Sequence, residues 1–300
     1  MAKEDCHRRV QEHPRDLALS RLNAVAASVQ PIGVFDSGVG GLSVLRALQA
    51  EMPLERLVYV ADGGHAPYGD RDDDHVLKRS HAITDYLIAS HGVKALVVAC
   101  NTATAAAIHT LRQAYPHLPI IGIEPALKPA AAISKTGRVG VMATRATLNS
   151  EKFGKLLDSL YGSATFVLQP CDGLADAIER ADGPRTLALC TEYTRAMGRF
   201  GHTSSDMDTL VLGCTHYPFV ASGLQSLVGQ RTALLEGGEP VARQTRRMLE
   251  KSDLLASADV ARGTLQKHPQ LRFYSTGDLS RLDSALKRWL QLDTQSQALA

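Results

Sequence analysis

The chain has 300 residues, in which 33 Lys and Arg residues nearly balance 31 Asp and Glu residues, for a formal net charge of +2. This balance creates no strong field for nucleic acid or a membrane surface, so neither is an expected partner. The five cysteines are odd in number, widely spread and without a C-x-x-C pair. This usage argues against a disulfide framework or a metal site and favours the reducing cytoplasm.

Residues 1–30 are expected to be an N-terminal extension. They carry charges throughout, which does not fit the apolar core of a signal peptide. Within them, apolar residues at helical spacing predict one docked helix over Arg15–Val29. No apolar run in the chain approaches the roughly 20 residues that cross a bilayer, so no membrane span is expected.

From Pro31 onward, short apolar runs alternate with helical patterns, which predicts the α/β class with parallel sheets built from βαβ units. The chain should end with a strand at Arg272–Tyr274 and a helix over Leu279–Leu292. The other expected strands are Ile32–Phe35, Leu57–Val60, Ala95–Ala99, Ile120–Ile123, Val139–Met142, Thr165–Leu168, Thr209–Leu212 and Ala233–Leu235.

An internal repeat predicts two similar halves. The segment Ile32–Gly38 is echoed by Val139–Arg145, which ends in Ala-Thr-Arg, with a 107-residue offset between Gly33 and Gly140. Two cysteines in matching contexts are 114 residues apart. We therefore expect two parallel-sheet α/β domains related by a pseudo-two-fold axis, with the active site in the cleft between them. The first domain would comprise 31–123 and 232–300, and the second 124–231.

Cys100 and Cys214 are the strongest candidates for chemistry. Each follows a short apolar run and a small residue, which places the thiol at the carboxyl end of a buried strand, where ligands bind in open α/β sheets. Two facing thiols suit removal of a proton from one face of a carbon and its return to the other. A following helix N-terminus would increase the thiolate fraction. Cys171 and Cys190 are predicted to be inert core residues.

The turn 36–41 (Asp-Ser-Gly-Val-Gly-Gly) follows the first strand. It lacks the G-x-G-x-x-G pattern and the lysine of a phosphate-binding loop, so a nucleotide is not expected. Asp36 suits a substrate ammonium or a proton relay to a thiol, with turn formation as the alternative. Ser37 fits substrate contact and turn formation equally well.

Polar residues follow both thiols. Asn101, Thr102 and Thr215 can cap helices, hold a substrate carboxylate, or do both. His216 can protonate or steady Cys214, or it can simply pack there.

Together these segments resemble the glutamate racemases. The matching motifs are Val34–Gly41, Pro67-Tyr68-Gly69, Ala99–Ala103 and Leu212–Pro218. The resemblance implies cofactor-independent, two-base interconversion of L- and D-glutamate, which supplies D-glutamate for peptidoglycan. It implies that Cys100 acts on the D-enantiomer and Cys214 on the L-enantiomer.

The resemblance also implies further site residues. Glu179 lies eight residues after Cys171, a spacing found in the family, and would be the partner of His216. The implied catalytic set is Cys100, Cys214, Asp36, His216 and Glu179. The implied substrate-binding set is Asp36, Ser37, Pro67, Tyr68, Gly69, Asn101, Thr102, Thr144, Thr215 and His216.

Several properties stay open at this stage. The family allows a homodimer and, through an N-terminal extension, activation by a cell-wall precursor. Two cysteines alone also fit a related racemase that acts on aspartate, and some relatives bind DNA gyrase as regulators. The chain departs from the family at Glu236-Gly237-Gly238 and in the loop Gly63–Ala66.

Overall fold

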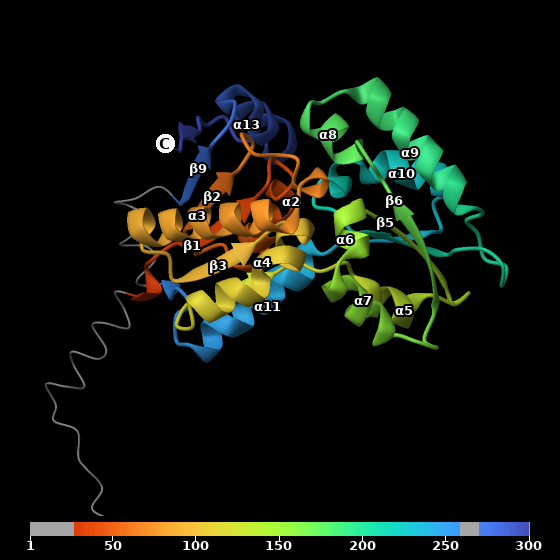
Figure 1. Ribbon diagram of the computed structural model, residues 1–300, viewed down its shortest axis with the longest axis horizontal. Helices are drawn as coiled ribbons and strands as arrows, with labels where there is room; N and C mark the ends of the chain where they lie inside the picture. The colour runs from red at the N-terminus through yellow and green to blue at the C-terminus, as the bar shows by residue number, and fades with distance from the viewer. Residues whose placement is uncertain (1–26, 259–269, 300) are drawn as a thin grey trace, which may run out of the picture.

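The computed structural model describes residues 27–258 and 270–299 as two α/β lobes, each built on a parallel sheet (Figure 1). The first sheet has the order β10-β9-β2-β1-β3-β4, and the second has the order β6-β5-β7-β8. This arrangement confirms the predicted α/β class with two parallel-sheet halves. The strands are β1 (Ile32–Asp36), β2 (Leu57–Ala61), β3 (Ala95–Val98), β4 (Ile120–Gly122), β5 (Arg138–Ala143), β6 (Thr165–Pro170), β7 (Thr209–Leu212), β8 (Ala233–Leu235), β9 (Leu271–Ser275) and β10 (Gln297–Ala298).

The strand order shows the internal repeat directly. The order β2-β1-β3-β4 in the first sheet is matched by β6-β5-β7-β8 in the second. The expectation that the chain returns to the first half at Ala233 is wrong, because β8 pairs with β7 in the second sheet. β8 is the counterpart of β4, so the repeat itself requires it there. The return to the first lobe comes with the helix that follows.

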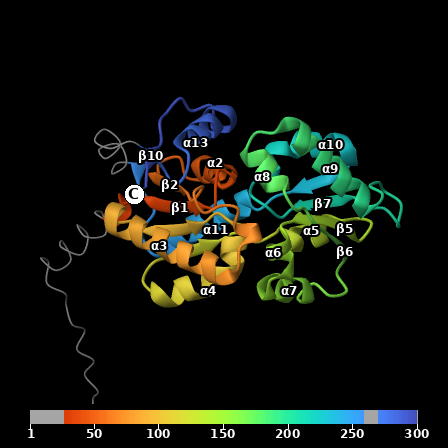
Figure 2. The ribbon, with the colours of Figure 1, turned by 45° about the horizontal axis from the view of Figure 1, so that its top comes forward.

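Helices cover both faces of each sheet (Figure 2). The first lobe contains α2 (Leu42–Glu51), α3 (Asp73–His91), α4 (Asn101–Ala114), α11 (Gly238–Lys251) and α13 (Leu279–Ala285). The second contains α5 (Leu127–Ile133), α6 (Arg145–Asn149), α7 (Glu151–Asp158), α8 (Leu174–Glu179), α9 (Gly183–Met197) and α10 (Ala221–Val228). Short turns are η1 (Tyr68–Asp70), η2 (Tyr217–Val220) and η3 (Leu286–Leu290).

Alternation along β1 builds two cores on opposite faces of the first sheet. Ile32 and Val34 pack with apolar residues of α2 and α11, whereas Phe35 packs with residues of α3 and α4. Successive strand side chains point to opposite faces, so a run that is apolar throughout predicts a strand covered on both sides. The sequence of β1 therefore places its carboxyl end, and the turn after it, at the edge of a rigid, doubly covered sheet.

The C-terminal elements agree in type with their predictions. The expected strand at 272–274 is β9, and the expected helix is α13 extended by η3, ending where Gln291 adopts a positive φ of 57°. β10 was not predicted, since its two residues are exposed and form no pattern. The helix predicted over Arg15–Val29 lies almost entirely outside the described residues. No helix among 27–258 and 270–299 is long and apolar enough to cross a membrane.

One aromatic contact joins the two lobes. Trp289 of η3 stacks on Phe219 of η2, with ring centroids 3.9 Å apart and ring planes 5° from parallel. Both rings pack against a core of the first lobe and a core of the second. This stacking holds η3 next to the segment that follows Cys214.

Candidate active site

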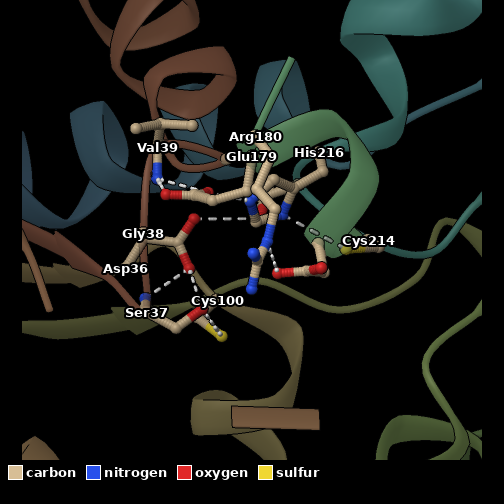
Figure 3. Close-up of polar contacts among 12 residues, drawn as sticks. Asp36, Ser37, Gly38, Val39, Cys100, Glu179, Arg180, Cys214 and His216 are labelled. Atoms are coloured by element: carbon tan, nitrogen blue, oxygen red, sulfur yellow. Dashed lines mark hydrogen bonds and ion pairs between the residues drawn. The ribbon is translucent and has the colours of Figure 1, made fainter. Parts of the chain in front are cut away.

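A pocket of about 120 Å³ lies between the lobes and is lined by residues from both. Both candidate thiols line it, and they approach the labelled cluster from different sides (Figure 3). The structure brings nearly all the predicted site residues to this one pocket. Those in its lining are Ser37, Pro67, Tyr68, Gly69, Cys100, Asn101, Thr102, Thr144, Glu179, Cys214, Thr215 and His216.

The first thiol sits at the N-cap of α4, directly after β3. The backbone N–H of Ala103 donates to Cys100 Sγ at 3.5 Å, as expected for a sulfur at a helix N-terminus. The thiol itself donates to Ser37 Oγ at 3.9 Å. Burial, and then the nearby Asp36 carboxyl, raise the pKa of Cys100 well above its ordinary value. The hydrogen bond from the helix N-terminus lowers this pKa but is outweighed by burial.

The second thiol has a charged partner. Cys214 Sγ lies 3.6 Å from His216 Nδ1, and His216 Nε2 lies 2.6 Å from Glu179 Oε2. Burial alone would lower the pKa of His216, but its bonds to Cys214 and Glu179 outweigh burial and raise that pKa well above its ordinary value. The imidazolium is therefore the favoured form of His216, and its Nδ1 faces the sulfur of Cys214.

The backbone after Cys214 differs from the prediction of a helix start. A turn and the short η2 separate this thiol from α10, and the hydroxyl of Thr215 does not cap a helix. It donates instead to Asp36 Oδ2 in the other lobe, at 3.1 Å. Of the two roles considered for Thr215, helix capping is therefore not found, and binding of a substrate carboxylate stays a prediction.

Asp36 is fully buried behind Ser37 and is absent from the pocket lining. Its Oδ1 accepts from Ser37 N–H at 2.6 Å and from Ser37 Oγ–H at 3.2 Å. Burial raises the pKa of Asp36, His216 opposes this rise and Glu179 adds to it. The position favours a relay through Ser37 to Cys100 over a direct contact with a substrate ammonium.

Two glycines of the turn after β1 make room for the paired side chains of His216 and Glu179 in the second lobe. A Cβ atom at Gly38 would lie 2.5 Å from Glu179 Oε2, and one at Gly40 would lie 2.4 Å from His216 Nδ1. Between them, Val39 N–H donates to both carboxylate oxygens of Glu179, at 3.2 and 3.0 Å. The glycines are required here for this approach between lobes, which the sequence motif alone did not reveal.

A cluster of three hydroxyls joins the two lobes beside the pocket, with Thr102 and Thr144 in the pocket lining and Thr147 outside it. Thr102 of α4 lies 3.1 Å from Thr144 and 3.4 Å from Thr147, measured between hydroxyl oxygens, and Thr144 caps α6. Thr147 was missed by the sequence analysis, although its spacing of three residues from a capping threonine was a usable signal. Nearby, the Oδ1 of Asn101 is buried without a hydrogen-bond partner, so the pocket offers it to a ligand.

The mouth of the pocket carries arginines that the sequence analysis also missed. Arg145 pairs with Asp172, and Arg180 with Asp176, while Arg281 of α13 joins the lining from the first lobe. No group of three or more His, Cys, Asp or Glu side chains in the described part of the chain is arranged to hold a metal ion. The chemistry available here is that of thiols, a charged histidine and buried carboxyls.

Comparison with known proteins places the chain in a class. The family model for Asp/Glu/Hydantoin racemases matches residues 42–245, and the chain belongs to that family. Within it, the chain is 46% identical over 272 residues to the glutamate racemase of Ectopseudomonas mendocina, covering 90% of this chain and 97% of that protein. The relatives that it resembles are thus racemases named for glutamate.

Solved structures agree with this placement. The glutamate racemase isoform RacE1 of Bacillus anthracis has a TM-score of 0.77 and 31% identity, covering 90% of this chain and 97% of that chain. The Escherichia coli glutamate racemase, in complex with L-glutamate and the activator UDP-MurNAc-ala, has a TM-score of 0.74 and 27% identity, covering 90% and 97%. The resemblance inferred from the sequence motifs is thereby confirmed over most of the chain.

Proposed function

We propose that this chain is a glutamate racemase that interconverts L- and D-glutamate by a two-base mechanism. The observation that carries the proposal is the convergence of Cys100 and Cys214, one from each lobe, on a single pocket. Each sulfur has its own proton partner, Ser37 for the first and His216 for the second. A pair of bases on different sides of one pocket is what inversion at the α-carbon requires.

In the proposed reaction, one cysteine acts as thiolate and takes the α-proton, leaving the electron pair of the broken bond on the α-carbon. The other thiol delivers its proton to the opposite face, and its sulfur becomes the thiolate. By resemblance, Cys100 deprotonates D-glutamate and Cys214 deprotonates L-glutamate. His216, held by Glu179, is the proton partner of Cys214, while Asp36 acts on Cys100 through Ser37. Preorganised donors at the substrate carboxylate would stabilise the developing carbanion.

The proposed binding groups are mostly neutral donors. Hydroxyls and amides bind a carboxylate without adding a fixed cation that would compete for the thiolate. The unpartnered Asn101 Oδ1 supports a polar ligand in this pocket. The groups proposed to bind substrate are Ser37, Pro67, Tyr68, Gly69, Asn101, Thr102, Thr144, Thr215 and His216.

The domain division, site of action and assembly belong to the same proposal. We place the second domain at 124–235, because β8 pairs within its sheet, with 31–123, 236–258 and 270–299 forming the first. The E. coli relative is bound to L-glutamate and an activator, which supports a role in D-glutamate supply for peptidoglycan and the possibility of activation here. A cytoplasmic homodimer completes the proposal.

The decisive experiment measures exchange of the α-proton for deuterium in D₂O, with glutamate and aspartate as separate substrates. Exchange with racemisation of glutamate alone is expected. Exchange confined to aspartate would assign the chain to a different substrate within the family. Absence of exchange with both amino acids, in folded protein tested with and without UDP-MurNAc-ala, would favour a non-catalytic role.

A further inference from the structure

A buried carboxylate that has no role in the proposed reaction is hydrogen-bonded to three separate segments of the first lobe. Asp62 follows β2, is fully buried and does not line the pocket. Arg79 of α3 donates two hydrogen bonds to it, both at 2.9 Å. The Tyr68 hydroxyl donates at 2.6 Å and the Thr276 hydroxyl at 2.7 Å, and His65 Nδ1 lies 3.0 Å away. Such a set of partners fixes each segment relative to the others.

The charge of this group is well compensated. Burial alone would raise the pKa of Asp62, but hydrogen bonds from Arg79, Tyr68 and Thr276 outweigh burial and hold that pKa below its ordinary value. The bidentate geometry of Arg79 is the strong form of a carboxylate–guanidinium pair. Asp62 is therefore a permanent acceptor at neutral pH.

The contact with Thr276 joins residues more than 200 positions apart. β2 and β9 pair in register from Leu57↔Leu271 to Ala61↔Ser275, and Thr276 N–H continues this pairing to the carbonyl of Ala61 at 3.1 Å. Gly64 N–H donates to Thr276 Oγ1 at 3.1 Å. A Cβ at Gly64 would lie 2.6 Å from the carbonyl oxygen of Thr276. The two backbones thus touch beyond the ends of their strands.

The segment held by this joint is a wall of the pocket. Its lining members are Gly63, Ala66, Pro67, Tyr68, Gly69 and Asp70. Tyr68 packs in the same core as Cys100. At the far end of the wall, a Cβ at Gly69 would lie 3.2 Å from Thr144 Cβ in the second lobe. The wall therefore closes the pocket beside the first thiol and reaches across to the opposite lobe.

We propose that Asp62 and Thr276 are positioning residues, which together fix the pocket wall 63–70 beside Cys100. Through Thr276, which directly follows it, strand β9 thereby contributes to substrate binding. The inference rests on the proposed racemase function and adds a requirement to it. Neither residue touches substrate; both act through Tyr68 and the wall. If the wall is less ordered in the free protein, substrate binding must order it, and this costs binding free energy. Loosening the wall is therefore expected to raise KM more than it lowers kcat.

The first test is Thr276→Val, which keeps the shape of the side chain and removes its hydroxyl. We expect KM for both enantiomers to rise about three- to tenfold, with kcat changed by less than about twofold, because the wall loses the hydroxyl's hydrogen bonds with the Asp62 carboxylate and Gly64 N–H. Thr276→Ser restores the hydroxyl and should restore KM. The control is Thr245→Val, a buried threonine of α11 whose hydroxyl donates to Val241 O at 2.8 Å. A KM for Thr276→Val equal to that of the control would overturn the proposal.

The second test does not depend on activity. Amide hydrogen exchange across 63–70 should be at least about tenfold faster in Thr276→Val than in the wild type, with β3 and α4 unchanged, because the local opening free energy falls. Gly64→Ala, which forces the two backbones apart, should do the same, whereas Gly223→Ala has open space for its Cβ and should not. Unchanged exchange in both test variants would overturn the positioning role. Failure of the wild type to racemise glutamate would instead overturn the proposed function.

Discussion

The turn after β3 and the turn after β7 have similar sequences, Ala-Cys-Asn-Thr and Gly-Cys-Thr-His, but place their sulfurs in different surroundings. Cys100 caps a 14-residue helix and faces a serine with a buried acid behind it. Cys214 begins a turn and faces a histidine paired with a glutamate. The repeat determines where each sulfur lies. How each sulfur holds its proton depends on its own partners, which are Ser37 for Cys100 and His216, paired with Glu179, for Cys214.

The feature that both turns share, the cysteine itself, is expected to give the largest effect when it is replaced. Cys100→Ala and Cys214→Ala should each abolish racemisation, since each thiol serves one face of the α-carbon. Circular dichroism should show an intact fold in both variants. Cys190→Ala, in the core of the second lobe, is the matched control and should remain active. Racemisation at the wild-type rate by either single variant would contradict the two-base mechanism.

The histidine is the sharpest difference between the two turns. His216→Asn should lower kcat/KM about a hundredfold or more, the lower end of the range for general acid–base groups. The fall must be equal in both directions, because the two enantiomers have equal free energy. The asymmetry appears in the α-deuterium isotope effect, which should rise with L-glutamate as substrate and stay small with D-glutamate. Equal isotope effects in the two directions would remove the assignment of His216 to Cys214.

Asp36→Asn tests the other turn. It removes a charge that contacts Ser37 and Thr215 and should lower kcat/KM about ten- to a hundredfold, which corresponds to about 1.5–3 kcal/mol for one charge-assisted contact. The isotope effect should now rise with D-glutamate. Thermal stability should change little, because Asn keeps the turn conformation. A near-normal kcat/KM would mean that Asp36 only shapes the turn.

The last expected effect is on stability and not on rate. Because the pKa of His216 is raised in the folded state, its charge stabilises the fold fully below the unfolded pKa of about 6.5, and this contribution is lost as pH rises through the folded pKa. Glu179→Gln should weaken this contribution, by about 1.5–3 kcal/mol at low pH. Urea unfolding at pH 6 and pH 9 should therefore show a larger difference between wild type and variant at pH 6. A difference that grows with pH would contradict the assigned charge state.

The positions of most strands and of both thiols could be predicted from the sequence, because they depend on local patterns. A buried apolar run followed by a small residue and a cysteine leaves few alternatives for the place of Cys100 or Cys214. The partner strand of β8 depends on pairing, not on its own three residues, and was assigned to the wrong sheet. The position of Asp36 behind Ser37, and the joint of Asp62 with Thr276, arise from segments far apart in the chain. No local pattern encodes such contacts.

The stack of Trp289 on Phe219 has an optical consequence. The chain contains one tryptophan, so its tryptophan fluorescence comes from a single ring that lies between the two lobes. Phe219 lies five positions after Cys214, in the segment that follows the second thiol turn. Any shift of one lobe against the other changes the environment of that ring. The tryptophan fluorescence of the native protein can thus report movement of one lobe against the other during titration with either enantiomer, without an added label.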